Sequence, residues 1–319
     1  MKILLANPRG FCAGVNMAIS TVEQALDIVG APIYVYHEIV HNRHVVEHFE
    51  KSGVVFVDSI EEVPENSTVI FSAHGVSPEV RNGAKSRGCA MIDATCPLVT
   101  KVHMEAIRYA KQGLQIVLIG HAGHDEVVGT VGEAPNAITI VECAEDVAKL
   151  EVQDEEQLVY LTQTTLSIDD ANSIIDALRS RFPGIKSPPS EDICYATTNR
   201  QRAVRALAHE ADLVLVVGSK NSSNSIRLTE IAENGGTKAY LVDDVSEIDW
   251  SWLEGVETLL LTAGASAPEH LVEEIIEEFK SRYAATVEDR QVMSEDMHFA
   301  LPSSLRRLQG SKTEEPVAV

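Results

Sequence analysis

Three kinds of sequence follow one another in the stretch Val69-Ile70-Phe71-Ser72-Ala73-His74-Gly75-Val76-Ser77-Pro78-Glu79. An apolar β-favouring run comes first, then a loop of small and polar residues, and then the Ser-Pro-Glu combination typical of a helix start. The same order occurs in Val159-Tyr160-Leu161-Thr162-Gln163-Thr164-Thr165, with Ser167-Ile168-Asp169-Asp170 behind it, and in Leu259-Leu260-Leu261-Thr262-Ala263-Gly264-Ala265, with Ser266-Ala267-Pro268-Glu269 behind it. A composite pattern that recurs in this way indicates an internal repeat.

The flanking sequence recurs as well, with a period of about 90 to 100 residues. Upstream of each stretch lie two further β-favouring runs, at 33–36 and 54–58, at 116–119 and 138–142, and at 213–217 and 240–243. Any α/β protein shows some recurrence of strand, loop and helix, but the matched order of several features favours true repetition. We therefore predict an α/β fold of three small domains with mainly parallel sheets, related by a pseudo-threefold axis around a common centre.

The repeat sets the expected domain boundaries. The first repeat covers residues 13–96, the second 97–193 and the third 194–285, which also takes in an N-terminal strand within 1–12. Residues 286–319 are expected to form a C-terminal tail, with a mobile end from Ser311 to Val319. Ligands of open α/β sheets bind beyond the carboxyl ends of the strands, so three such domains would direct their loops into one central cavity.

Composition excludes several classes of protein. The chain has 319 residues with 48 acidic and 26 basic side chains, a formal charge of −22, which argues against a nucleic-acid or anionic-membrane partner. No apolar run approaches the roughly 18 to 20 residues of a membrane span, and no signal-peptide pattern follows Met1. Five widely spaced cysteines do not form a disulfide pattern, so we expect a cytoplasmic protein with reduced thiols.

Three of the cysteines, Cys12, Cys96 and Cys194, stand at equivalent positions just ahead of helical patterns. One such cysteine alone would more often be a small buried apolar residue, but the repeat brings three together, and helix N-termini stabilise thiolates. Three thiolates suit a [4Fe-4S] cluster with one iron left open for substrate. Zinc held by three cysteines and one histidine is the alternative metal. Cys89 and Cys143 lie outside these positions and are interpreted as structural or incidental.

Polar residues at the other strand ends predict an anion site and an acid. His41, His74 and His124 lie in three loops, and the run Ser222-Ser223-Asn224-Ser225 precedes a helical pattern. An ordinary helix cap needs one of these four residues, so a phosphate or diphosphate ligand explains the run better. Glu126 can donate a proton if burial raises its pKa, and the Thr164 hydroxyl could orient or relay that proton.

At these positions the chain resembles a known family. The matching blocks are 6–15 (ANPRGFCAGV), 37–42 (HEIVHN), 71–76 (FSAHGV), 93–99 (DATCPLV), 120–126 (GHAGHDE), 162–167 (TQTTLS), 192–197 (DICYAT), 217–225 (VGSKNSSNS) and 261–266 (LTAGAS). They resemble the 4-hydroxy-3-methylbut-2-enyl diphosphate reductases, the LytB-type iron–sulfur reductases. The blocks follow in order over roughly residues 1–280.

The resemblance implies a fold, a cofactor and an activity. It implies three α/β domains around a [4Fe-4S] cluster held by Cys12, Cys96 and Cys194. The expected substrate-binding residues are His41, His74, His124, Thr164, Ser222, Ser223, Asn224 and Ser266, and the expected catalytic residues are Glu126, His124 and Thr164. The substrate hydroxyl would bind the open iron and leave as water, after two electrons from reduced ferredoxin or flavodoxin. The products would be isopentenyl and dimethylallyl diphosphate, in the last step of the methylerythritol phosphate pathway.

The sequence departs from the family pattern at two places. Asp125 stands where similar sequences more often carry proline, which puts a second carboxylate beside Glu126. Residues beyond about 285 match poorly, apart from Phe299 to Pro302. For the electron donor, we expect docking at a local basic patch that includes Arg200, Arg202 and Arg205.

Two other functions fit parts of the sequence. The H-x-x-H-x-E pattern of His121, His124 and Glu126 would suit a metal-dependent phosphohydrolase, although its spacing differs from the helical pair of zinc proteases. A non-catalytic regulator that binds a phosphorylated metabolite could use the same scaffold. Metal content and turnover with a reductant distinguish these functions from the reductase.

Overall fold

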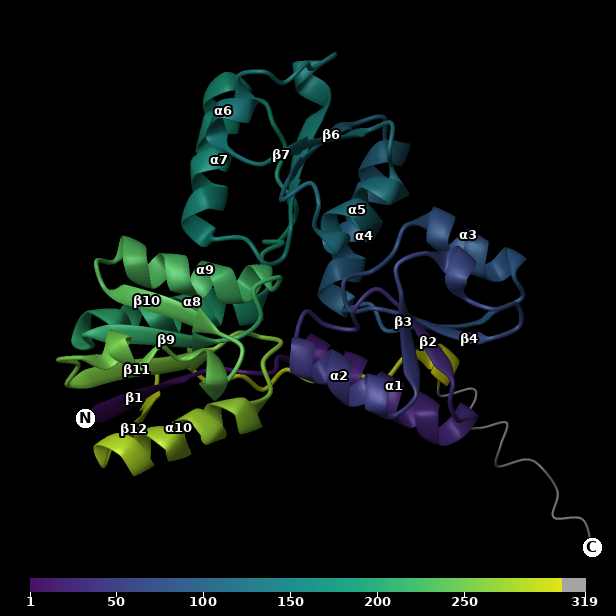
Figure 1. Ribbon diagram of the computed structural model, residues 1–319. Helices are drawn as coiled ribbons and strands as arrows, with labels where there is room; N and C mark the ends of the chain where they lie inside the picture. The colour runs from purple at the N-terminus through teal and green to yellow at the C-terminus, as the bar shows by residue number, and fades with distance from the viewer. Residues whose placement is uncertain (306–319) are drawn as a thin grey trace, which may run out of the picture.

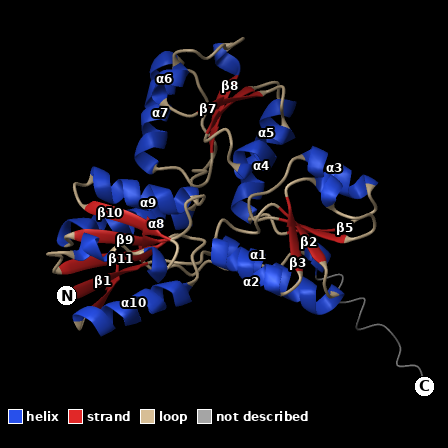
Figure 2. Cartoon of the chain, in the orientation of Figure 1, coloured by secondary structure: helices blue, strands red, loops and turns tan. Residues whose placement is uncertain are grey.

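The computed structural model describes residues 1–305, so the predicted mobile end at 311–319 lies outside the described residues. The named strands form three sheets in which every pairing is parallel. Figure 2 shows three groups of strands, each with its own helices, set around the middle of the molecule. The predicted α/β class with parallel sheets is confirmed.

The first sheet has the order β3-β2-β4-β5, with β2 at Ile33–Tyr36, β3 at Val54–Val57, β4 at Thr68–Phe71 and β5 at Ala90–Asp93. Helices α1 (Ala13–Val29) and α2 (Arg43–Lys51) pack on one face. Helix α3 (Pro78–Ser86) packs on the other. Its N-cap is Ser77, followed by Pro78 at the first helical position, as the sequence pattern predicts.

The second sheet has the order β7-β6-β8, with β6 at Gln115–Ile119, β7 at Ile138–Val141 and β8 at Leu158–Thr162. Helices α4 (Pro97–Lys111) and α5 (Asp125–Glu133) cover one face. Helices α6 (Ala144–Val147) and α7 (Ile168–Arg181) cover the other. Ser167 caps α7 and accepts a hydrogen bond from the Asp170 backbone N–H.

The third sheet has the order β10-β9-β11-β1-β12, with β9 at Leu213–Val217, β10 at Lys238–Val242, β11 at Thr258–Ala263, β1 at Lys2–Asn7 and β12 at Thr286–Gln291. Helices α8 (Tyr195–Leu207) and α9 (Ser223–Asn234) cover one face, and α10 (Glu269–Tyr283) covers the other. All three sheets are thus covered on both faces, as parallel sheets usually are.

The three sheets share one connection pattern (Figure 1). β1 belongs to the third sheet, yet the chain continues from it through Cys12 into α1 on the first sheet. β5 of the first sheet leads through Cys96 into α4 on the second. Lys186, bridged to Val159 of the second sheet, precedes Cys194 and α8 on the third. Each of these cysteines therefore lies where the chain crosses from one sheet to the next. The domain boundaries 13–96, 97–193 and 194–285 with strand 1–12 follow this pattern, and we propose them on that basis.

The predicted C-terminal tail is wrong for its first six residues. Residues 286–291 form β12, an edge strand that pairs with β1 from Lys2↔Thr286 to Asn7↔Gln291. Its side chains are mostly exposed and polar, which is typical of an edge strand and hides the apolar pattern that reveals buried strands. Farther along, Leu301 and Leu305 pack into the core of the first sheet. The segment 286–305 therefore connects the third sheet to the first.

Arg200 is fully buried, so its predicted place in an exposed docking patch is wrong. Its guanidinium donates to the Gly10 carbonyl at 2.7 Å and the Ala196 carbonyl at 3.0 Å, and pairs with Glu295 at 3.1 Å. It thereby ties α8 to the loop before Cys12 and to the C-terminal segment. In the same helix Arg202 and Arg205 are exposed.

We predict that Arg200→Ala is strongly destabilising, because it removes the guanidinium donor of the buried Gly10 oxygen and the charged partner of Glu295, which keeps only its hydrogen bond from Asn199. Breaking a buried ion pair costs about 3 to 5 kcal/mol. Urea unfolding followed by circular dichroism measures the loss, and Arg202→Ala, in the same helix but exposed, is the control. Equal stability of the two variants would contradict the structural role of Arg200.

The described residues contain no helix that is both long and apolar enough to cross a membrane.

Candidate functional site

Three thiols converge at the centre of the molecule. Cys12, Cys96 and Cys194 are the N-cap residues of α1, α4 and α8, and all three line the same cavity. At Cys12 and Cys96 the side chain accepts no capping hydrogen bond. None of the three forms a disulfide. The free N–H groups of three helices thus surround the same small volume and favour negative charge there.

Gly14 permits two of the sulfurs to approach each other. A Cβ atom at this position would lie 2.7 Å from the Cys96 Sγ and 3.8 Å from the Cys12 Sγ. The glycine is in the first turn of α1, where its φ angle is ordinary for a helix, so the constraint is one of space. A side chain here would have to displace the Cys96 thiol.

Burial disfavours the thiolate form of these cysteines in the protein alone. It raises the pKa of Cys96 to about 12 and that of Cys194 to about 11, against partial compensation from nearby N–H groups. Thr197 helps at Cys194, where its backbone N–H donates to the Sγ at 3.4 Å and its hydroxyl lies 3.2 Å away. Thiolates at such a site need a cationic metal centre as their counter-charge.

The sulfurs are spaced too widely for one metal ion. Two sulfurs bound to one zinc are at most about 4.6 Å apart, since each Zn–S bond is about 2.3 Å. In the described residues the three cysteines do not form a group whose ligand atoms all lie within 4.8 Å of one another. This spacing argues against the three-cysteine zinc site, whereas a multinuclear group fits.

Beside the thiols lies a buried acid with a single partner residue. Glu126 is 2 % exposed, and Thr164 donates to both of its oxygens, the backbone N–H to Oε1 at 2.7 Å and the hydroxyl to Oε2 at 2.8 Å. Burial raises the pKa of Glu126 to about 7, although these hydrogen bonds act in the opposite direction. The carboxyl group can therefore gain and lose a proton near neutral pH.

Three histidines form the next part of the cavity wall. The rings of His41 and His74 stack with centroids 4.0 Å apart, and His124 meets both rings edge-on at 5.4 and 5.7 Å. Burial lowers the pKa of His124 to about 4 and places that of His74 well below its usual value. Near neutral pH these two rings are uncharged in the protein alone, and a bound anion would raise their pKa values.

His124 is also the N-cap of α5. Its Nδ1 accepts a hydrogen bond from the Glu126 backbone N–H at 3.2 Å, so in the neutral ring Nε2 carries the proton. The ring thus presents an N–H donor, which suits an anionic ligand.

The start of α9 supplies neutral hydrogen-bonding groups. Ser222 caps the helix, and its hydroxyl accepts from Ser225 at 3.0 Å and from Ser266 at 3.3 Å. The Asn224 side chain is 4 % exposed, yet neither its oxygen nor its nitrogen has a partner among the described residues. Gly218 and Gly264 allow this packing, because a Cβ at either would overlap the Ser225 hydroxyl. An unpartnered buried amide in a cavity wall indicates that a polar ligand completes its hydrogen bonds.

All of the site residues predicted from the sequence line this one cavity. They are Cys12, His41, His74, Cys96, His124, Glu126, Thr164, Cys194, Ser222, Ser223, Asn224 and Ser266. Their placement together is a structural fact, whereas their individual roles stay predictions.

The structure adds residues that the sequence did not single out. Thr197 stands three residues after the Cys194 cap, a spacing that could have marked it as a thiol partner. Arg227 contacts His121 at 2.9 Å. No local pattern pairs these residues, because His121 follows β6 of the second sheet and Arg227 lies in α9 on the third.

The hydrolase ligand set does not assemble. Both Glu126 oxygens accept hydrogen bonds from Thr164, and His121 Nε2 is in contact with the Arg227 guanidinium. His124 Nδ1 accepts the capping hydrogen bond from the Glu126 backbone N–H. A different group has the spacing for one metal ion in the part of the chain that the structure describes. It consists of His41, His74 and Asp125.

Comparison with known proteins decides the family. The model of the family described as "LytB protein" matches residues 3–280. The chain belongs to this family. Among its relatives, the 4-hydroxy-3-methylbut-2-enyl diphosphate reductase of Rhodopirellula baltica is 56% identical over 306 residues, covering 96% of each chain. The protein of the same name from Streptomyces avermitilis is 55% identical over 307 residues, covering 96% of this chain and 91% of the relative.

Solved structures agree with this family membership. The E-1-hydroxy-2-methyl-but-2-enyl-4-diphosphate reductase of Plasmodium falciparum superposes with a TM-score of 0.94 at 39% identity, over 98% of this chain and 99% of that chain. A second structure, described as the terminal enzyme of the non-mevalonate pathway, has a TM-score of 0.62 at 30% identity, over 88% and 100%. The resemblance read from the sequence blocks is thus confirmed at the level of the LytB family.

We predict that Gly14→Ala lowers the iron content of anaerobically reconstituted protein, because the added methyl group displaces the Cys96 thiol. Overpacking of this kind costs about 1 to 3 kcal/mol. Gly123→Ala is the matched control, since a Cβ at Gly123 meets nothing within 4 Å. Equal iron content in the two variants would show that the thiols tolerate the displacement.

Proposed function

We propose that this member of the LytB family reduces (E)-4-hydroxy-3-methylbut-2-enyl diphosphate to isopentenyl and dimethylallyl diphosphate. The reaction breaks the allylic C–O bond, forms a C–H bond and releases water, and it consumes two electrons and two protons. The observation that carries the proposal is one cavity whose wall holds three helix-capping thiols, a buried acid and the buried Asn224 amide, which has no hydrogen-bond partner among the described residues. The names of the relatives support the substrate.

The proposed cofactor is a [4Fe-4S] cluster held by Cys12, Cys96 and Cys194. The thiols fit it because they are free, converge from three helix N-termini and are spaced beyond the reach of one ion. When bound, such a cluster supplies the one-electron transfers that the reduction needs. Three protein ligands leave room for substrate at the centre of the cavity.

The proposed diphosphate site is the wall formed by the histidines and the α9 helix start. His124 presents its Nε2–H, and neither the oxygen nor the nitrogen of the Asn224 amide has a partner among the described residues. The N–H groups of the first turn of α9 add positive potential. His41, His74, Ser222, Ser223 and Ser266 complete the site. Most of these groups are neutral donors, so the acidic chain can bind an anion without a lysine cluster.

Glu126 and Thr164 are the proposed route for protons. The acid lines the same cavity as the thiols and the histidines. Its proton is available near neutral pH because burial raises its pKa. The Thr164 hydroxyl, bound to Oε2, can hold the acid in place and pass a proton to the departing hydroxyl. His124 orients the same turn through its cap.

The identity of the electron donor and the cellular compartment of the protein are also proposals. Reduced ferredoxin or flavodoxin would supply the electrons one at a time, to a protein in the cytoplasm. Of the residues proposed for docking, Arg202 and Arg205 are exposed, and Arg205 pairs with Asp169.

An anaerobic assay with purified protein, this substrate and reduced methyl viologen tests the function. We expect both products, together with loss of iron and activity in each of the variants Cys12→Ser, Cys96→Ser and Cys194→Ser. Cys89→Ser and Cys143→Ser are the matched controls and should keep both. A wild-type protein that holds its cluster but gives no turnover would refute the proposed reaction. Full activity in a colourless protein that contains only zinc would refute the cofactor.

The pH dependence of turnover tests the role of Glu126. Because its pKa is raised to about 7, the acid is protonated below that value, and the rate should fall as the pH rises through it. We expect Glu126→Gln to keep iron and substrate binding, to lose about 100-fold or more in turnover, and to lack this alkaline fall. A variant with wild-type rates, or one with the same pH profile, would contradict proton delivery by Glu126.

A further inference from the structure

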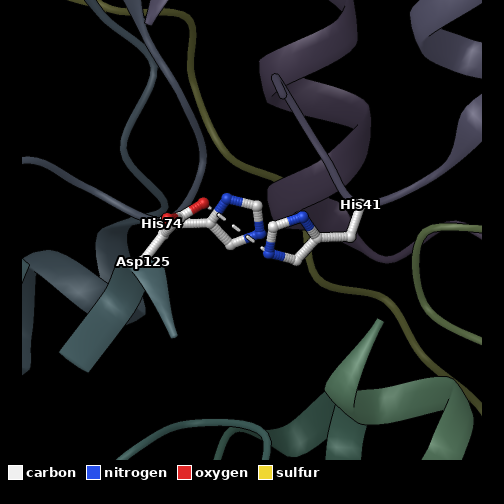
Figure 3. A group of neighbouring side chains, drawn as sticks. All are labelled: His41, His74 and Asp125. Carbon is white, nitrogen blue, oxygen red and sulfur yellow. Dashed lines mark ion pairs between the residues drawn. The ribbon is translucent and has the colours of Figure 1, made fainter. Parts of the chain in front are cut away.

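A second group of ligand atoms lies at the edge of the cavity. His41 comes from the loop after β2, His74 from the loop after β4, and Asp125 from the first turn of α5. One nitrogen or oxygen from each lies within 4.8 Å of the others (Figure 3). His41 Nε2 is 3.8 Å from Asp125 Oδ2, and the two rings are stacked. His41 and His74 thus follow strands of the first sheet, and Asp125 lies in a helix that packs on the second sheet.

Each of the three side chains is held from behind by another polar group. Glu38 Oε2 lies 3.1 Å from His41 Nδ1, the Ser72 hydroxyl 3.4 Å from His74 Nδ1, and His37 Nδ1 2.7 Å from Asp125 Oδ1. With Nδ1–H given to Glu38, the neutral ring of His41 keeps its lone pair on Nε2. This is the arrangement of metal-binding histidines, whose far nitrogen donates to a carboxylate or another oxygen.

His124 differs from His41 in which ring nitrogen carries the proton. Its Nδ1 accepts from the Glu126 N–H, so its Nε2 is a hydrogen-bond donor and cannot ligate a cation in that form. His41 has the opposite arrangement, because its Nδ1 donates to Glu38 and the lone pair on Nε2 stays available for a cation. The Asp125 carboxylate next to His41 also favours a cation there. His41 and His74, which belong to the proposed anion site, therefore also form with Asp125 a group that has the character of a cation site.

We propose that His41, His74 and Asp125 bind one divalent transition-metal ion of the zinc class. Two imidazole nitrogens and one carboxylate oxygen suit Zn²⁺, Co²⁺ or Fe²⁺, whereas Mg²⁺ and Ca²⁺ prefer oxygen ligands throughout. The side chains of His41 and Asp125 are 14 % and 21 % exposed, so an aqueous ion can reach them. Three protein ligands leave at least one coordination position for water.

The ion would compete with the substrate for the histidines. A ring nitrogen that ligates a metal cannot also hold a phosphate oxygen, so a bound ion removes His41 and His74 from the anion site. This consequence rests on the proposed function, whereas metal binding itself does not. The metal would act as an inhibitor whose binding also links the loops of the first sheet to α5 of the second.

Equilibrium dialysis of the cluster-loaded protein against Zn²⁺ under anaerobic conditions, with elemental analysis, tests the site. We expect the wild type to retain one more zinc per chain than Asp125→Asn. Asp169→Asn is the matched control, because Asp169 is exposed and pairs with Arg205 on another helix. Glu38→Gln leaves all three ligands in place and should weaken binding about 10- to 100-fold. Equal zinc content and affinity in the wild type and Asp125→Asn would overturn the proposal. Zinc bound by the cysteines cannot produce a difference between the two proteins, because both contain the same cysteines.

Inhibition of turnover by Zn²⁺ tests whether the bound ion competes with the substrate, separately from whether the ion binds. Relative to its own metal-free rate, Asp125→Asn should need at least about 10-fold more Zn²⁺ for half-inhibition than the wild type, as for the loss of a ligand. Zinc that binds through Asp125 without inhibiting would overturn the competition with substrate. A protein that binds zinc through Asp125 but never reduces the diphosphate would refute the proposed reaction and leave the metal site standing.

Discussion

The structure depends on one constraint, which is that the chain passes from sheet to sheet at three cysteines. After β1, β5 and the Lys186 bridge, the chain leaves one sheet, caps a helix with Cys12, Cys96 or Cys194, and packs that helix on the next sheet. Each crossing brings a helix N-terminus to the centre. Because the thiols cap three helices at once, their positions are fixed by the packing of all three sheets.

The same geometry gathers the remaining groups of the cavity. All strands run parallel within their sheets, so their carboxyl ends carry the loops with His41, His74 and Thr164. Parallel pairing also places helices α5 and α9 with their N-termini at that edge, where Glu126 and Asn224 lie in the first turns. The chemistry of the cavity is thus an outcome of topology, with an acid, imidazoles and neutral amides set around a common point.

Burial gives these groups their functional character. It raises the pKa of Glu126 towards neutrality, keeps the Cys96 and Cys194 thiols protonated in the protein alone, and lowers the pKa of His74 and His124. All of these shifts disfavour charge in the cavity of the protein alone. The site therefore gains from a metal centre that stabilises thiolates and from an anion that stabilises protonated imidazoles.

Local patterns in the sequence were sufficient for the repeated strands, for the helix starts at Ser77, Ser167 and Ser222, and for the three cysteines, three histidines, Glu126 and Thr164 of the cavity. The family resemblance added Ser266, and neither of them marked Thr197. The local patterns missed β12, whose polar edge residues carry no apolar signal, and they put Arg200 on the surface although its guanidinium is fully buried. Only the tertiary structure decided those two points, the link between Thr164 and both Glu126 oxygens, and the meeting of Asp125 with His41 and His74. Such contacts join residues from separate elements, and their distances follow from the packing of whole sheets, which no short stretch of sequence encodes.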